Sequence, residues 1–347
     1  MKQIIDNLLL SAAMAAILAG LPVLAFSQFR LPAPPEKPER IERVEKHDPP
    51  AMPMIWGGDT SEKSIRVDSS INLSLCITQG TVKVNGWNRN EVRVYVQDGS
   101  KFGFNVREKS SRTGDPIWIK VMGVAVKGKY GAPQECISGN EIEIDVPVNA
   151  TIGIRGNETT TTIDTVRKVE VKTVEGDITL RNISGGIFAY AGQGDVSVEA
   201  STGAMMLETT TGNILVFEAS PSEIGDSFKA KTNGGTISLQ DLRHRQVEVG
   251  SISGSVLYSG VIRNGGSYNL STSKGSIRML IPADSACQLQ ATFGAGNFSS
   301  DPELGIKLLT ENVSEGPIKS IVGKLGTGGD AAVKLTTNNG SISIRKQ

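Results

Sequence analysis

The sequence predicts an all-β protein whose larger part is a single-stranded, β-helix-like solenoid, a stack of coils built from glycine corners and short strands. Three observations favour this fold class. Glycine is abundant, at 39 of 347 residues, whereas aromatic residues make up only 5%. Apolar and polar residues alternate through most of the chain after residue 60, and glycine recurs every nine residues in its middle part. Thin layers of strands use small and β-branched side chains and place glycine at tight corners.

Residues 1–27 have the features of a signal peptide. A lysine stands near the start, an apolar stretch follows, and Ala25 and Ser27 supply the small residues that a signal peptidase reads. We therefore expect cleavage before Gln28 and an extracytoplasmic protein that is periplasmic, on the cell surface or secreted. The alternative is an uncleaved membrane anchor.

Residues 28–60 form a predicted Pro-rich, charged linker. Seven of the fifteen prolines lie between Pro32 and Pro53. Proline lacks a backbone donor and fixes φ, so this stretch cannot join a sheet. The alternating charges from Glu39 to Lys46 are typical of a solvated spacer.

Residues 61–150 form a predicted N-terminal β region. Its short runs alternate apolar and polar residues, as expected for strands with one buried face. They lack the nine-residue phase seen later, which favours a β-sandwich-like cap. A turn is predicted at Asn85–Asn90. The predicted strands are Ile65–Val67, Ile71–Leu75, Val82–Val84, Val92–Val96, Phe102–Val106, Ile117–Val121 and Ile142–Val146.

Residues 151–347 form the predicted glycine-punctuated repeat domain. Five frames of nine residues run from Val174 to Glu218, each with glycine at the third place and apolar residues, mainly, at the fifth and seventh. The residue between those two faces the other way, so each frame is interpreted as a corner followed by a short strand. The corner glycines are Gly176, Gly185, Gly194, Gly203, Gly212, Gly235, Gly254, Gly275 and Gly340.

The later glycines are spaced by about 18 to 22 residues, which fits a coil with two strands per turn. One such coil cannot bury its own apolar face, so neighbouring coils must stack. A β-sandwich of hairpins is the competing architecture. Its hairpin loops would drift in length, whereas the nine-residue phase is held for five frames.

Several segments together resemble a known family. They are Gly80–Trp87, Ile142–Pro147, the repeated Thr-x-Gly-x-Ile units and Thr337–Ile342. In this series the chain is similar to the bacterial putative-adhesin family of β-strand-repeat proteins, a family of unknown function, over residues 65–347. The resemblance implies an extracytoplasmic β-solenoid-like domain and brings no established catalytic residues.

The cysteines and histidines are few. Cys76 and Cys136 are a candidate disulfide in an exported protein, and the alternative is that these two and Cys287 are buried thiols. The two histidines, His47 and His244, lie far apart without a ligand pattern around them, so we expect no metal site and no cofactor. The balance of 36 basic and 36 acidic residues argues against nucleic acid as a partner.

No catalytic constellation is evident. A calcium-binding nonapeptide roll needs an acid in every turn, but Asp177 and Asp195 give way to Ala204 and Asn213. A carbohydrate-active enzyme needs clustered carboxylates, and we expect the candidate acids to be scattered and solvated. These acids are Glu170, Glu175, Asp177, Asp195 and Glu199.

Two further polar features stand out. Asp241, Arg243, His244 and Arg245 form the densest polar cluster, which is either a ligand-contacting loop or a plain surface turn. The threonine runs at residues 159–162 and 209–211 are expected at outward positions, either as a flat binding face or as solvated residues with high β-propensity.

These features together predict an exported, non-enzymatic structural or interaction protein with an adhesin-like or envelope-associated role. Its partner would be a protein or glycan at the cell envelope, and open strand edges allow self-association. The alternatives are a secreted carbohydrate-active enzyme on a β-helix scaffold and an envelope stress sensor domain.

Overall fold

The computed structural model describes residues 60–107, 117–124, 136–223, 225–312 and 318–347. The predicted signal peptide and all but the last residue of the predicted linker lie outside these ranges. Most of the described residues lie in strands, and their only helix is one 3₁₀ turn, Pro302–Leu304. The all-β prediction is confirmed.

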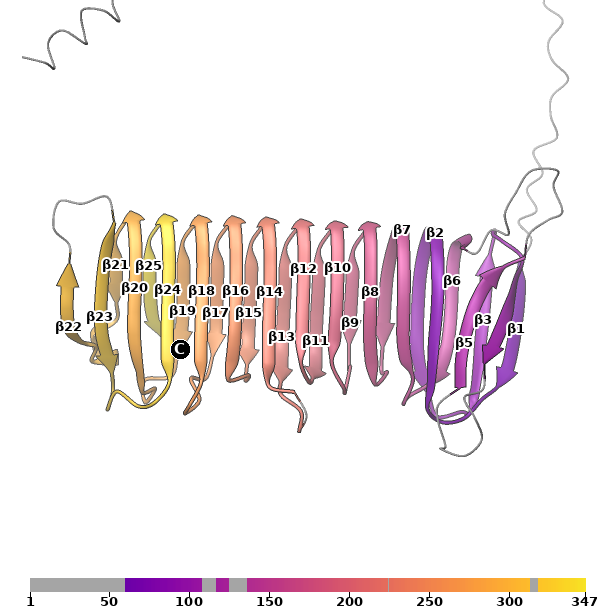
Figure 1. Cartoon of the computed structure of the whole chain (residues 1–347), viewed down its shortest axis with the longest axis horizontal. Helices are drawn as coiled ribbons and strands as arrows, with labels where there is room; N and C mark the ends of the chain where they lie inside the picture. Colours follow the sequence, from indigo (N-terminus) through magenta and orange to yellow (C-terminus); the bar gives the residue numbers. More distant parts are fainter. Residues whose placement is uncertain (1–59, 108–116, 125–135, 224, 313–317) are drawn as a thin grey trace, which may run out of the picture. The chain divides into compact units, whose positions relative to one another are not determined.

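The central part is a stack of coils with two strands each, seen edge on in Figure 1. One strand of every coil belongs to a first face and the other to a second face. The first face contains β8 (Lys168–Glu175), β10 (Ile187–Gln193), β12 (Met205–Thr211), β14 (Ser227–Gly234), β16 (Gln246–Ser253) and β18 (Ser267–Lys274). The second contains β9 (Ile178–Arg181), β11 (Val196–Thr202), β13 (Ile214–Ser220), β15 (Ile237–Leu242), β17 (Val256–Gly260) and β19 (Ile277–Ile281).

Neighbouring coils pair in parallel, which confirms the solenoid and excludes a sandwich of hairpins in this region. Ile187 of β10 lies opposite Met205 of β12, so one coil takes 18 residues, or two frames of nine. The same shift relates β9 to β11 and β11 to β13. A longer loop between β13 and β14 and one between β17 and β18 lengthen later coils without breaking the parallel pairing.

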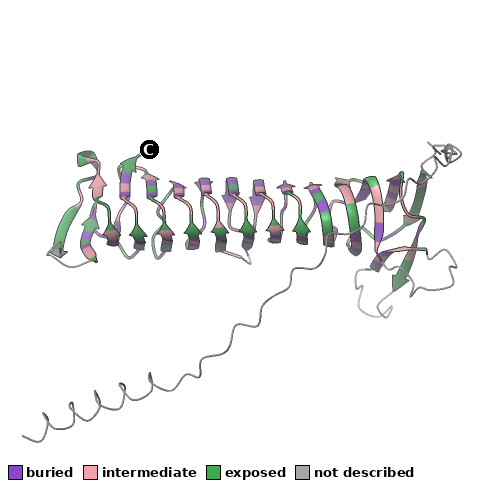
Figure 2. Cartoon of the chain, turned by 90° about the horizontal axis from the view of Figure 1, so that it is seen from above, coloured by how far each residue is buried: buried purple, intermediate pink, exposed green. Residues whose placement is uncertain are grey.

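The core lies between the two faces and is lined by alternate residues of each strand. In β12, Met205, Leu207 and Thr209 are buried, while Met206 points outward. Figure 2 shows this alternation of buried and exposed residues along the strands. Each coil contributes one thin layer to the core, as the nine-residue frames predict.

One corner of every coil is built from glycine because the coils approach too closely for a side chain. Gly194 and Gly212 have φ of 137° and 154°, a region that favours glycine. A Cβ on Gly212 would lie 2.0 Å from the carbonyl oxygen of Gly194. The same column contains Gly176, Gly235, Gly254, Gly275, Gly340 and Gly296. Gly185 and Gly203 lie at the opposite corner, where Gly186 and Ala204 are their neighbours.

A buried hydroxyl stands three residues before most of the glycines in this column. Thr209 donates to the carbonyl of Gly194 at 2.9 Å, Thr232 to that of Gly212 at 3.0 Å and Thr272 to that of Gly254 at 2.7 Å. The next coil therefore satisfies a carbonyl that the tight corner leaves without a second partner.

This arrangement corrects one prediction. Thr159, Thr161 and Thr209 were expected to point outward, but all three are buried. The hydroxyl of Thr209 points inward, where it donates a hydrogen bond to the carbonyl of Gly194 at the corner of the preceding coil. Apolar–polar alternation cannot assign a threonine run to one side, because threonine is suited to either.

At the N-terminal end the coils do not follow the order of the sequence. Strand β2 lies between β6 and β7 and pairs in parallel with both (Figure 1). The antiparallel strands β1, β3 and β4 close this end as a cap. The strands are β1 (Ser61–Arg66), β2 (Ile71–Trp87), β3 (Glu91–Gln97), β4 (Phe102–Arg107), β5 (Ile117–Gly123), β6 (Ile137–Pro147) and β7 (Thr151–Asp164).

Strand β2 departs from the sequence prediction in length. Two separate strands and a turn beginning at Asn85 were expected, but one continuous strand runs to Trp87. Gly80 lies within it at a φ of 134°, so the strand bends around the corner and serves both faces. The boundary at residue 150 remains a prediction, and β2 pairs with β7 across it.

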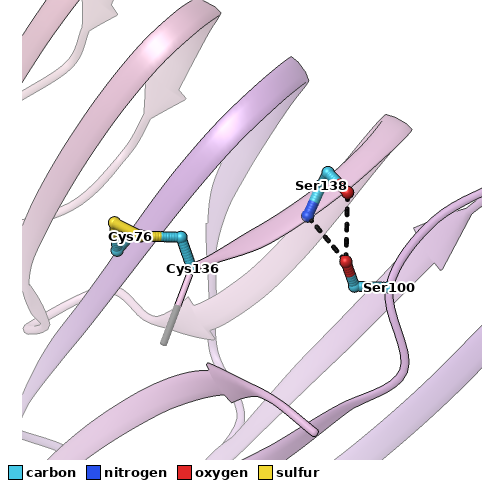
Figure 3. Close-up of a disulfide and its surroundings, with 4 residues drawn as sticks. All are labelled: Cys76, Ser100, Cys136 and Ser138. Atoms are coloured by element: carbon cyan, nitrogen blue, oxygen red, sulfur yellow. Dashed lines mark hydrogen bonds between the residues drawn. A yellow bond between two sulfur atoms is a disulfide. The ribbon is translucent and has the colours of Figure 1, made fainter. Parts of the chain in front are cut away.

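Cys76 and Cys136 form a disulfide that joins β2 to the start of β6, with 4.4 Å between their Cα atoms (Figure 3). Next to it, the backbone amide of Ser138 donates to the hydroxyl of Ser100 at 3.0 Å. Cys287 is buried with a free thiol, and burial raises its pKa to about 11. The N-terminal insertion of β2 is thus fixed covalently.

The C-terminal end is also interleaved. The last coil, β24 (Ala332–Asn339) and β25 (Ile342–Lys346), lies between β18–β19 and the coil formed by β20 (Cys287–Ala295) and β21 (Phe298–Ser300). In Figure 1 the yellow β24 stands between the orange β18 and β20. Two antiparallel strands, β23 (Lys319–Leu325) and β22 (Lys307–Asn312), extend the first face beyond β20.

We predict that Gly212→Ala lowers the free energy of unfolding by about 2 kcal/mol or more, because the new Cβ meets a backbone oxygen that cannot move without separating two coils. Gly234→Ala is the matched control, since its Cβ would meet nothing within 4 Å. We expect the control to change stability by less than about 0.5 kcal/mol. Denaturant unfolding followed by circular dichroism measures both, and equal effects would contradict the close-approach argument.

Candidate functional site

The predicted polar loop lies at the second corner, between β15 and β16, and its residues point in different directions. Arg243 pairs with Asp241 at 2.9 Å. Arg245 pairs instead with Asp226 from the preceding corner, and the amide of Arg245 donates to the same carboxylate at 2.8 Å. The charged side chains are thus neutralised by one another. A ligand-contacting role for this loop remains a prediction.

His244, from the same loop, is fully buried and packs beside Phe228 with 5.7 Å between ring centroids. Its Nε2 lies 2.8 Å from the carbonyl oxygen of Gly203, and its Nδ1 has no partner among the described residues. Burial lowers the pKa of His244, against the opposing effects of the bond to Gly203 and of the Asp226 charge. We therefore assign it a structural role, filling the interior beside the longer β13–β14 loop.

The candidate acids do not converge. Glu170 pairs with Lys172 on the first face, and Glu199 pairs with Arg181 on the second. Asp177 and Asp195 lie beside the glycine column, where each accepts the backbone amide of the next coil at 2.8 and 2.7 Å. Among the residues that the structure describes, no group of three or more His, Cys, Asp or Glu is placed to hold a metal ion.

The outer side of the second face carries the most distinctive surface. Its outward residues form two columns, because parallel pairing holds each coil in register with the next. Leu215 and Phe217, both from β13, are each 45% exposed. Leu215 is flanked in register by Ser197 on β11 and Ser238 on β15, and Phe217 by Glu199 and Gln240 on the same two strands. A large apolar pair therefore stands between polar side chains, which are small hydroxyls beside Leu215 and a carboxylate and an amide beside Phe217.

This alternation of large and small residues hollows the surface. One hollow, of about 230 Å³, is lined by residues of β9, β11, β13 and β15. A second, of about 420 Å³, continues over β15, β17 and β19. The two share Phe217, Ser238 and Gln240, so together they make one groove that crosses the strands. We call this feature the second-face groove.

The second-face groove has little net charge. Arg181 and Glu199 face each other at its β9–β11 end, with 3.2 Å between Nε and Oε2. The other polar side chains lining the 230 Å³ hollow are uncharged: Thr179, Ser197, Ser238 and Gln240. The 420 Å³ hollow adds one acid and one base, Asp241 and Arg278, which leave the net charge near zero. Such a surface offers an apolar platform and neutral hydrogen-bonding groups, which suits a ligand that is itself uncharged and has both apolar faces and hydroxyls.

The sequence analysis did not single out these groove residues, although a signal was present. In the frame TTGNILVFE, Ile214 to Phe217 are all apolar, as are runs in ISGGIFAYA and STGAMMLET, whereas VEGDITLRN and GQGDVSVEA alternate. Buried positions account for Ile214 and Val216, so Leu215 and Phe217 had to be outward and exposed. The tryptophans contribute nothing to the groove: Trp87 and Trp118 lie on β2 and β5, outside it, and Trp56 is outside the described residues.

Fold and surface together define a parallel β-solenoid with a groove on the outer side of one face. The chain belongs to the Toastrack DUF4097 family, whose sequence model matches residues 59–345. The resemblance to the bacterial putative-adhesin family is thereby confirmed. No curated protein matches the chain. Among the described residues, no helix is long and apolar enough to cross a membrane.

Solved structures with a similar fold share little sequence with this chain. A "putative adhesin" from Parabacteroides merdae is 10% identical, with 84% of this chain and 97% of that chain covered and a TM-score of 0.37. A "putative adhesin" from Bacteroides fragilis is 13% identical, with 83% and 97% covered and a TM-score of 0.33. A "putative lipid binding protein" from Parabacteroides distasonis is 10% identical, with 84% and 98% covered and a TM-score of 0.34.

We predict that stability falls as the pH drops below the ordinary histidine pKa of 6.5. The unfolded imidazole of His244 takes up a proton in this range, whereas the folded one resists it until a lower pH. The free energy of unfolding should therefore decrease by up to about 1.4 kcal/mol per pH unit in this window.

Denaturant unfolding at pH 7.5 and pH 5 tests this effect, with His244→Phe as the variant that removes the titrating group. Although burial acts to raise it, hydrogen bonds from Arg245 hold the pKa of Asp226 below its usual 3.8, so Asp226 does not titrate in this window. An equal loss of stability in the variant and the natural protein would exclude His244 as the cause.

Proposed function

We propose that this chain is an exported, non-enzymatic, adhesin-like protein that binds an uncharged glycan chain in the second-face groove. The observation that carries the proposal is the exposed pair Leu215 and Phe217, with serine side chains on both sides of Leu215 and a glutamate and a glutamine on either side of Phe217. A sugar ring presents an apolar C–H face and a rim of hydroxyls. It can therefore lie on Phe217 while Ser197, Ser238 and Gln240 exchange hydrogen bonds with its edge.

The dimensions of the groove favour a chain over a single small molecule. The groove crosses successive strands, which lie about 4.8 Å apart in any sheet. Its two hollows continue past Phe217 from β9 to β19. An extended glycan can therefore place one sugar after another over consecutive coils, with Phe217 in the middle of the contact.

Charge argues against an acidic polysaccharide as the ligand. Arg181 is occupied by Glu199, and the Glu199 carboxylate lies in register beside Phe217, where it would repel an acidic sugar, while Gln240 on the other side of Phe217 is uncharged. A protein partner is a weaker fit, because stable protein interfaces bury about 800 Å² per partner around a central apolar core. Here the exposed apolar surface is restricted to one strand and its neighbours.

Binding without cleavage follows from the placement of the acids. Glycoside hydrolysis needs two carboxyl groups on either side of one scissile bond. Two acids line the groove in the described residues, Glu199 in the 230 Å³ hollow and Asp241 in the 420 Å³ hollow, and they pair with Arg181 and Arg243. The predicted signal peptide and the proline-rich linker support a role outside the cytoplasm, with the linker holding the solenoid away from a surface.

We predict that Phe217→Ala weakens binding to a neutral glycan by about 10-fold to 100-fold, the equivalent of losing about 1.5–3 kcal/mol of buried aromatic surface. Phe188→Ala is the matched control, because Phe188 is an outward aromatic residue on the first face, where Lys172 lies 4.9 Å from its ring centroid. A glycan array with the purified protein identifies the ligand, and isothermal titration measures both variants.

The array also separates the alternatives. Binding confined to acidic glycans, or no glycan binding at all, would refute the proposal. So would a Phe188→Ala variant that loses as much affinity as Phe217→Ala. Release of shortened sugars from the bound glycan would instead support the carbohydrate-active alternative.

A further inference from the structure

The C-terminal coil, residues 332–347, fills a slot inside the stack and does not lie at its end. On one side, β24 and β25 pair with β18 and β19. On the other side they pair with β20 and β21. All four pairings are parallel, so this coil has the same surroundings as a coil in the middle of the solenoid.

The slot recognises the last coil through its backbone, its core residues and its corner. Ile277 donates its amide to the carbonyl of Ser341 at 2.9 Å, and Ile342 donates to that of Asn297 at 3.0 Å. Val333, Leu335 and Ile342 are buried between the neighbouring layers. Gly340 stacks on Gly275, where a Cβ would lie 1.9 Å from the carbonyl oxygen.

Polar contacts complete the fit. The amide of Ser341 lies 3.2 Å from the hydroxyl of Ser276, and Thr337 donates to the carbonyl of Gly275 at 2.8 Å. Arg345 pairs with Asp301 at 2.6 Å. Each of these contacts joins residues 332–347 to a residue that precedes β22 in the chain. None of them involves the connection between β23 and β24.

The two interleaved ends are secured differently. At the N-terminal end, the disulfide between Cys76 and Cys136 ties the inserted β2 to β6. At the C-terminal end all the contacts described are non-covalent. The connection from β23 into β24 contains Gly326 and Gly328, with φ of 58° and 86°, followed by Gly329. Glycine permits this connection to take other paths at low cost.

We infer that residues 332–347 are an exchangeable coil and that a second copy of this chain can supply it. The slot would then make the same hydrogen bonds and bury the same side chains, and only the path of the connection would differ. Exchange of an identical element between protomers is a low-cost route to association. A reciprocal exchange would hold two second-face grooves in one assembly and raise the avidity for a repeating ligand.

This mode of association differs from pairing at the open edges. Among the described strands, β1, β4, β21 and β22 each pair with one neighbour only and form the edges, and none of them is exchanged. Exchange replaces an internal coil by an identical one, so it adds no new strand to the stack. Its signature is a contact between residue 276 of one chain and residue 341 of another.

Two variants of the full-length chain, Ser276→Cys and Ser341→Cys, each made in a Cys287→Ala background that removes the free thiol, test this contact. Cα atoms on neighbouring strands lie within the about 4.4–6.8 Å that a disulfide spans. The two variants carry tags of different mass and are mixed, either as native proteins at high concentration or unfolded and refolded together. After oxidation, a non-reducing gel reports the covalent heterodimer.

The matched control mixes Ser255→Cys with Ser341→Cys. Ser255 belongs to the same polar ladder and contacts Ser276, but it lies one coil farther from Ser341. Two strand spacings amount to about 10 Å, which is too far for a disulfide. The double variant Ser276→Cys/Ser341→Cys shows that the geometry permits the disulfide, because both cysteines then lie on neighbouring strands of the same chain.

We expect at least ten times more heterodimer from the Ser276→Cys and Ser341→Cys mixture than from the control mixture. Heterodimer from the native mixture or from the refolded mixture supports exchange, since in either case one chain has supplied the coil of another. Equal yields in the test and control mixtures, or no heterodimer even after joint refolding at high concentration while the double variant closes its bond, would overturn the inference.

Discussion

The close approach of backbones at the glycine corner is the constraint on which the rest of the fold depends. Along this column each missing Cβ would lie only 1.9–2.4 Å from a carbonyl oxygen of the preceding coil. The corner therefore sets the distance and the register between coils. Because the register is fixed, inward residues stack into continuous layers, and hydroxyls such as that of Thr232 meet the carbonyl they must satisfy.

The same register creates the candidate binding surface. Outward residues of successive coils lie in straight columns, so the surface depends on which side chains occupy neighbouring places and not on a folded loop. A groove arises on the second face because Ser197 and Ser238 flank Leu215. On the first face the outward residues include paired charges, such as Lys229 and Lys231 with Glu248, which leave less apolar surface for a ligand.

Much of this fold could be predicted from the sequence because its determinants are local. The nine-residue phase of the glycines predicted the strands, the corners and two strands per coil, and the parallel register of 18 residues confirms it. Whether the threonines point into the core or to the solvent could not be predicted, since a residue such as Thr209 is suited to both environments. The groove was not predicted either, because Ser197 and Ser238 are distant from Leu215 in sequence and meet it only through the register of the coils.

The order of coils at the two ends could not be predicted for a different reason. Residues 332–347 repeat the same corner-and-strand pattern as every other coil, so nothing local distinguishes a coil inserted between two earlier coils from one added at the end.

The insertion of the last coil has a consequence for assembly. The slot between β18–β19 and β20–β21 exposes parallel sheet edges on both sides until β24 and β25 enter it. Exposed parallel edges bind any suitable strand. Closing this slot with the chain's own last coil therefore completes the solenoid. The inserted strand at the N-terminal end, β2, is held by the disulfide of Cys76, whereas the C-terminal coil is held by non-covalent contacts alone.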